Sequence, residues 1–267
     1  MSADSKWVDF IQNTIGANHL LQVDELSGAF NDSIGSLSVP FTAGITTNQT
    51  SLLKGNSTDK SILGAGTSDA KSTQDIQLST PLTTSSGGLR GPWCFGFLMS
   101  KSGNPTSHTY LWGAGDQSHA RSEIVLYMNT TDTFLLIPGV IQASVGSHAT
   151  TGLTDGNPHL ILINYNIGNS PTIDRFHYSI DGAAFTSLGA DFALVDAPQS
   201  YPSTGRRFFS VLAQESLSGV NTGVTADEFF LVPNELSDAQ AADIYDKALV
   251  TGFPSGIPVH LLIQGGK

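Results

Sequence analysis

Cysteine is almost absent from the chain, since Cys94 is the single cysteine among 267 residues. One thiol cannot form an internal disulfide or supply the several sulfur ligands of a cysteine-based zinc site. Charged residues are also scarce, at 13% of the chain against roughly a quarter in typical globular domains. We therefore expect a core without covalent cross-links, in which Cys94 packs as a small buried residue, and a polar but mostly uncharged surface.

Positive charge is especially scarce. The chain has 12 Lys and Arg against 23 Asp and Glu, which gives a formal net charge of −11. Phosphate backbones and anionic membrane surfaces are bound through clustered basic side chains. We therefore predict that neither nucleic acid nor a membrane is a partner.

Long hydrophobic runs are missing as well. The longest, residues 134–141, is interrupted by Pro138 and is too short to cross a bilayer. The first residues lack the apolar segment of a secretory signal peptide. These features predict a protein that is made in a cytosol.

The most informative stretch that is present runs from Asp155 to Gly182. Residues 160–165 form a short apolar run bounded by turn-forming residues, which is typical of a strand covered on both faces. Residues 176–180 alternate between apolar and polar side chains and end at Asp181 and Gly182, which suit a tight turn. We interpret the stretch as a hairpin of two strands inside a sandwich, and further short strands follow the spacing expected of an all-β domain.

Both ends of the chain carry different patterns. A helix is predicted before Gly16, with an apolar stripe that includes Trp7, Phe10 and Ile11. A second helix is predicted after the capping residue Ser237. The stripe could pack on its own domain or bind a partner, and both alternatives stay open. We divide the chain into an N-terminal helix or arm (1–17), a sandwich domain (18–251) and a C-terminal tail (252–267).

Three segments carry a family resemblance. They read DGNPHL at 155–160, ending in DG at 181–182; LLQVDELSG at 20–28; and DEFFLVPNELSDAQ at 227–240. Together they resemble the hairpin, opening strand, and closing strand and helix of laminin-G-like, concanavalin A-like jelly rolls. The resemblance covers roughly residues 18–250 and implies a two-sheet antiparallel jelly-roll sandwich with short terminal helices. A leading helix before such a domain is similar to structural proteins of tailed bacteriophages.

Carboxylates beside glycine turns suggest a candidate metal site. Asp24, Glu25 and Asp32 lie beside the turns at Gly28 and Gly35, and oxygen ligands of this kind can hold calcium. The alternative is that these side chains bond to nearby turn amides. Calcium is the only cofactor that the sequence suggests.

No catalytic constellation is apparent in the sequence. Glycosidases on related folds need two carboxylates on one strand face, whereas Asp227 and Glu228 are adjacent and strict alternation would send them to opposite faces. His159 is interpreted as a packed strand-end histidine, because spacing dictates no neighbouring carboxylate. We predict that the chain is not an enzyme.

The resemblance implies two functions. The first is a virion structural protein, a capsid decoration or tail-associated subunit that binds other virion proteins; the second is a lectin or adhesin module that binds host-surface polysaccharide. An apolar strand in the tail could pair with a second copy or fold back along its own sheet edge, and both alternatives stay open. The first predicts a homo-oligomer, and the similarity to phage appendages implies a trimer. The predicted partner-binding residues are Trp7, Phe10, Ile11, Ile257, Val259, Leu261 and Ile263.

Overall fold

The structure is a computed structural model, and all statements below concern the residues that it describes. Among these residues, no helix has the length and apolar character needed to cross a membrane. The described residues are 3–41, 44–64, 67–68, 92–106, 109–116, 121–130, 133–138, 146–149, 152–166, 176–188, 208–212, 219–220 and 223–253.

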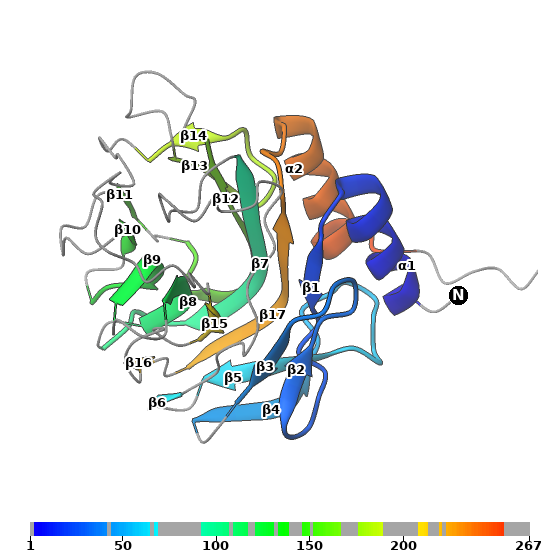
Figure 1. The fold of residues 1–267 in the computed structure, drawn as a ribbon, viewed down its shortest axis with the longest axis horizontal. Helices are drawn as coiled ribbons and strands as arrows, with labels where there is room; N and C mark the ends of the chain where they lie inside the picture. Colours follow the sequence, from blue (N-terminus) through cyan, green and yellow to red (C-terminus); the bar gives the residue numbers. More distant parts are fainter. Residues whose placement is uncertain are drawn as a thin grey trace, which may run out of the picture.

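Two antiparallel sheets form the body of the molecule (Figure 1). The larger sheet has, in order, β14 (Thr186–Ser187), β13 (Phe176–Ile180), β12 (Asp155–Tyr165), β7 (Trp93–Ser102), β17 (Val224–Val232), β5 (Lys60–Gly64) and β4 (Ile45–Thr50), and β1 (His19–Leu21) also pairs with β17. The smaller sheet has β11 (Gly146–Ala149), β10 (Thr133–Pro138), β9 (Arg121–Met128), β8 (Thr109–Asp116) and β15 (Phe208–Val211). Two short ribbons pair β2 (Ala29–Asn31) with β3 (Ser38–Pro40) and β6 (Thr67–Ser68) with β16 (Gly219–Val220). The predicted all-β antiparallel sandwich is confirmed.

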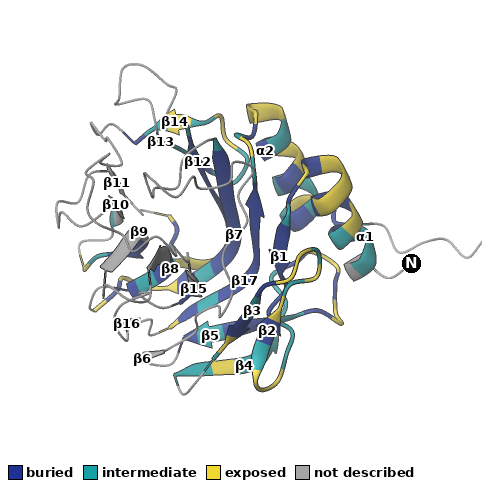
Figure 2. Ribbon diagram, viewed as in Figure 1, coloured by how far each residue is buried: buried dark blue, intermediate teal, exposed yellow. Residues whose placement is uncertain are grey.

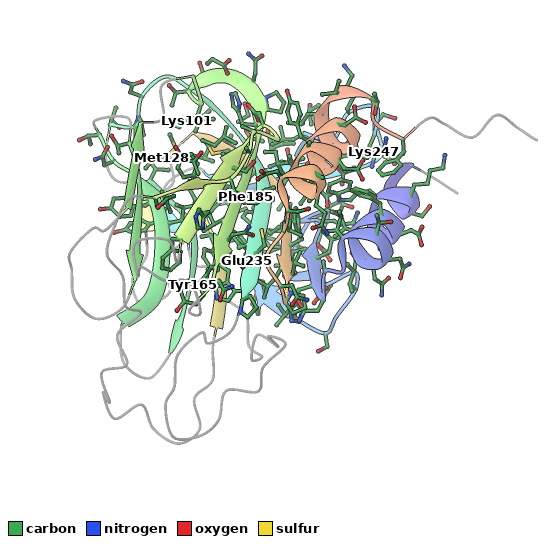
Figure 3. All side chains as sticks on the ribbon, turned by 90° about the horizontal axis from the view of Figure 1, so that it is seen from above. Lys101, Met128, Tyr165, Phe185, Glu235 and Lys247 are labelled. Atoms are coloured by element: carbon green, nitrogen blue, oxygen red, sulfur yellow. The ribbon has the colours of Figure 1, made fainter. Side chains whose placement is uncertain are left out.

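The helices lie together on one side of the larger sheet. Figure 1 shows them beside β1 and β17, and the perpendicular view in Figure 3 shows them again on the side away from the smaller sheet. They are α1 (Ala3–Asp9), its π-helical continuation η1 (Phe10–Ile15), α2 (Asp238–Tyr245) and its π-helical continuation η3 (Asp246–Val250). The order of layers is therefore small sheet, large sheet, helices.

Local sequence explains where the helices begin and end. Ser237 forms the predicted cap: its hydroxyl accepts from the amide of Gln240, and the Gln240 side chain accepts from the amide of Ser237. This reciprocal capping box satisfies two amides that the first helical turn leaves open. The first helix ends at Gly16, where φ is 84° and a side chain would be strained.

The inner core lies between the two sheets. Every second residue of β7 faces it, and Phe95 stacks on Trp112 of β8 with ring centroids 4.0 Å apart. Trp93 and Phe97 point to the same side, as their period-two spacing predicts. Large aromatic rings from both sheets therefore hold the layers together.

The outer core lies between the larger sheet and the helices. Leu160 and Leu162 of β12 face it, whereas Ile161 and Ile163 face the inner core. This explains the continuous apolar run, because a strand between two cores must be apolar on both faces. Cys94 is fully buried in the outer core, and burial raises the pKa of its thiol well above the usual range. Figure 2 shows the resulting band of buried residues along β12, β7 and β17.

Candidate functional site

The three residues predicted to bind calcium are each engaged by different partners. Asp32 is bonded by four backbone amides between residues 20 and 37, and its second oxygen lies 2.5 Å from Nδ1 of His19. Burial alone would raise the pKa of Asp32, but the bonds from His19 and the backbone lower it below its ordinary value. Glu25 accepts from the backbone and side-chain amides of Asn31, and Asp24 accepts from the amide of Lys60. Asp32 bonds to amides of its own turn, as in the alternative interpretation, whereas Glu25 and Asp24 accept from residues of β2 and β5. Calcium binding by these three residues stays a prediction.

A second group of polar side chains closes the central hairpin. The ring of His159 lies between two carboxylates, with Nδ1 2.7 Å from Asp181 and Nε2 3.1 Å from Asp155. We call these three residues the His159 cluster. The bond to Asp181 raises the pKa of His159, and bonds from Asn157 followed by His159 lower the pKa of Asp155 to about 2. With both ring nitrogens directed at carboxylates, the imidazole favours its cationic form and offers no free lone pair to a substrate.

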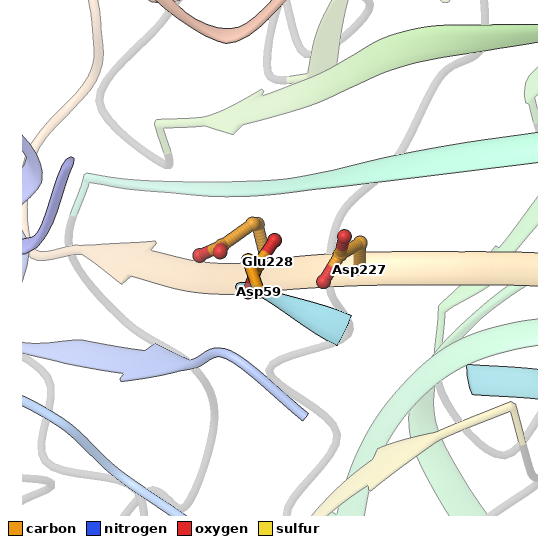
Figure 4. Close-up of side chains that lie close together, drawn as sticks. All are labelled: Asp59, Asp227 and Glu228. Atoms are coloured by element: carbon orange, nitrogen blue, oxygen red, sulfur yellow. The ribbon is translucent and has the colours of Figure 1, made fainter. Parts of the chain in front are cut away.

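A third group, which we call the acidic cluster, was not predicted. It consists of Asp59, Asp227 and Glu228, and one carboxylate oxygen from each lies within 4.8 Å of the other two (Figure 4). All three side chains are at most 1% exposed. Within the described ranges, these are the acidic, histidine or cysteine side chains that converge closely enough to hold a metal ion.

A bulge in β17 creates the acidic cluster. The register of β17 against β7 shifts between Asp227 and Phe230, and Glu228 has a φ of 53°. Ala226 and Phe229 both face the inner core, so the two residues between them turn together to the outer side. The expectation that Asp227 and Glu228 point to opposite faces is therefore wrong, because it assumed an unbroken strand.

Burial governs the protonation of the acidic cluster. It raises the pKa of both Asp227 and Glu228 well above the ordinary carboxyl range, and the nearby Asp59 raises both further. Asp24 contributes in the same direction. One of the residues predicted for calcium therefore lies near this cluster, although it is not one of its three members.

A pair of tyrosines lies on the outer face of the smaller sheet. Leu126 and Met128 face the inner core, so Tyr127 between them projects to the other side of β9. Tyr110 of β8 pairs with it, and the ring centroids are 5.7 Å apart. Tyr127 is buried and Tyr110 half-buried, so one partly accessible ring is supported by another.

The predicted partner-binding helix packs on its own domain. Trp7 and Ile11 are fully buried and Phe10 is 8% exposed, all within the outer core. Of the two alternatives for the stripe, the structure therefore supports packing on its own domain, because the larger sheet covers these side chains, and it does not support partner binding through them. The tail residues Ile257, Val259, Leu261 and Ile263 lie outside the described residues.

Comparison with known proteins gives similarity of fold alone. No protein-family model and no curated protein sequence matches the chain. Among solved structures, it is similar to the sialidase of Trypanosoma rangeli (TM-score 0.59, 10% identity, 92% of this chain and 37% of that chain) and to the same enzyme in complex with sialic acid (0.54, 10%, 86% and 32%). It is also similar to the binding domain of botulinum neurotoxin serotype D (0.54, 12%, 86% and 51%). The chain thus spans about a third of the sialidases and half of the toxin structure.

These similarities correct one prediction. The prediction that the chain is not an enzyme is contradicted, because solved structures that resemble most of it are sialidases. At 11% and 10% identity, the likeness extends to the fold and to no particular reaction. Neither the sialidase nor the toxin binding domain supports the bacteriophage resemblance.

Proposed function

We propose that the chain is a carbohydrate-binding module that contacts its ligand with the outer face of the smaller sheet. The observation that carries the proposal is the tyrosine pair, in which Tyr127 supports the accessible ring of Tyr110. Ligand sites combine aromatic surface with a few polar groups, and a tyrosine supplies both. The helices cover the opposite side of the sandwich, and the half-buried Tyr110 lies away from them on the outer face of the smaller sheet.

The similarities support a role in binding. The chain resembles a part of a sialidase that has been solved with sialic acid, and a part of a toxin binding domain. A segment shared between an enzyme and a toxin is more readily explained by recognition of a ligand than by one shared reaction. The net charge of −11 repels anionic sugars, so neutral glycans are the favoured ligand class.

A glycan array with neutral and sialylated sugars, probed with and without calcium, tests this function. The best ligands would then be titrated against the parent protein, Tyr110→Ala and Tyr110→Phe. Because aromatic contacts contribute modestly, we expect Tyr110→Ala to weaken binding by about three- to tenfold and Tyr110→Phe to retain most of it. An array without signal, or equal affinity in Tyr110→Ala, contradicts the proposal, and release of free sugar would identify a hydrolase.

The virion role and the homo-oligomer stay predictions. Light scattering on the full chain and on a variant that ends at Thr251 checks the oligomer. A monomer at high concentration would contradict it, and an oligomer unchanged by the truncation would contradict the part assigned to the tail.

A further inference from the structure

Asp227 and Glu228 in the acidic cluster each have one buried oxygen atom that no hydrogen bond satisfies. Oδ2 of Asp227 accepts from the amide of Leu52 at 2.9 Å, and Oε2 of Glu228 accepts from Nε1 of Trp7 at 2.5 Å. The other oxygens, Oδ1 of Asp227 and Oε1 of Glu228, are buried without a hydrogen-bond partner. Both side chains are 0% exposed. Buried polar atoms are nearly always paired in folded proteins, so these two indicate a ligand.

Protons are the alternative to a cation. One proton can join two carboxyl oxygens, so two protons would be needed to join all three side chains. A cation placed between the three side chains would contact all of them at once.

The spacing admits an ion, and the type of ligand selects it. Ligand atoms on opposite sides of a calcium ion, at about 2.4 Å each, are separated by about 4.8 Å. One oxygen from each side chain of the acidic cluster lies within 4.8 Å of the other two, so one ion can contact all three side chains. Carboxylates are the hard ligands that calcium prefers, whereas magnesium keeps several water molecules that a fully buried site does not readily admit.

We propose that Asp59, Asp227 and Glu228 bind one calcium ion between the outer face of the larger sheet and the N-terminal helix. The ion supplies the positive charge that these carboxylates need. Because Nε1 of Trp7 donates to Glu228, the ion also fastens the N-terminal helix to β17. The site is distinct from the tyrosine pair on the smaller sheet and does not depend on a carbohydrate function.

Thermal unfolding tests the proposal. The protein is refolded in chelator, because a buried ion exchanges slowly, and its unfolding midpoint is measured with and without added calcium at pH 7.5. A ligand that binds only the folded state at a hundredfold excess over its Kd should raise the midpoint by about 5–10 °C. Terbium gives an independent readout, since an ion bound beside Glu228 would be excited by the neighbouring Trp7.

Neutral variants of similar shape separate a metal site from a structural role. Asp227→Asn and Glu228→Gln remove the repulsion and the ligand charge together. We expect both variants to match or exceed the parent midpoint in chelator and to lose the response to calcium and terbium. The matched control is Asp155→Asn in the His159 cluster, which should keep the full response.

Each outcome decides the assignment. A calcium response in the parent and in Asp155→Asn, lost in Glu228→Gln, supports the site. A parent that does not respond overturns it, and equal responses in Glu228→Gln would place the bound ion elsewhere. A response to magnesium without one to calcium overturns the choice of ion.

Discussion

The His159 cluster and the acidic cluster differ in how their carboxylates are compensated. In the His159 cluster, an imidazole lies between Asp155 and Asp181, and Asp155 is accessible to water. In the acidic cluster, three carboxylates meet under the helices at 1% exposure or less. The pKa of Asp155 is consequently lowered to about 2, whereas the pKa values of Asp227 and Glu228 are raised.

The difference shows that the number of carboxylates in a group does not decide its chemistry. An adjacent cation and solvent stabilise the ionised form of a carboxylate, whereas burial beside other acids destabilises it. In the His159 cluster, side chains of the protein and solvent therefore already compensate the charge of the carboxylates. The acidic cluster still requires a proton or a metal ion, which is why it is the better place to look for a ligand.

The largest expected effect concerns the indole that donates to Glu228. Trp7→Phe removes this donor and leaves a further buried oxygen of Glu228 without its hydrogen bond. Trp93→Phe is the matched control, because Trp93 is 1% exposed and its Nε1 has no hydrogen-bond partner. We expect urea unfolding to give a loss about 2 kcal/mol greater for Trp7→Phe than for Trp93→Phe. Equal losses would mean that the bond contributes nothing.

A smaller effect is expected from the corresponding change in the His159 cluster. His159→Phe keeps a ring at this position but removes the bonds to Asp155 and Asp181. Since the cluster is partly solvated, we expect the free energy of unfolding to fall by about 1 kcal/mol. The half-buried His177 provides a control, since His177→Phe should change stability by less than about 0.5 kcal/mol. A similar loss of stability in His159→Phe and His177→Phe would show that the bonds of His159 to the two carboxylates contribute nothing measurable.

In acid, the two clusters should change the stability of the protein in opposite directions as the pH falls. Asp155 has a lowered pKa, so its contribution to stability is present above 3.8 and is lost as pH falls toward about 2. Asp227 and Glu228 have raised pKa values. In chelator, their contribution to stability is therefore fully present when the pH lies below the ordinary carboxyl pKa, and it is lost as the pH rises. Urea unfolding measured from pH 2 to 8 checks both expectations. Asp155→Asn should reduce the fall in the free energy of unfolding on the acid side. Glu228→Gln should reduce the fall in that free energy as the pH rises toward neutral.

His159 adds a separate transition. Its pKa is raised above 6.5, so its contribution is fully present below that pH and is lost as pH rises through the folded-state pKa. A nuclear magnetic resonance titration of the ring protons should place this pKa lower in Asp181→Asn than in the parent. An unchanged titration would show that Asp181 does not stabilise the cation.

The smallest effect should come from salt. At 1 M salt the screening length falls to about 3 Å, which weakens the solvated His159 cluster much more than buried contacts. The cost of His159→Phe should shrink, while the difference between Trp7→Phe and Trp93→Phe stays constant. If salt reduced both of these free-energy differences equally, the contrast in burial between the two clusters would be contradicted.

Much of the fold could be predicted from local patterns. The apolar run at 160–165 indicated a strand between two covered faces, and Ser237 indicated a helix cap; both are found. The acidic cluster could not be predicted from alternation, because a bulge interrupts it and Asp59 comes from a distant part of the chain. One signal was present in the sequence. The inward positions of β17 are spaced two, three and two residues apart at Val224, Ala226, Phe229 and Leu231, and the interval of three marks the bulge.

Burial of the lone cysteine beneath the helices gives the protein an internal kinetic reporter. Cys94 belongs to the same outer core as Trp7 and Ile244, so a thiol reagent can reach it only when that layer opens. Because there is one cysteine in the chain, the rate of modification under native conditions measures that opening directly. The separation of the helical layer from the sandwich can therefore be timed in the unaltered protein, without introducing a label.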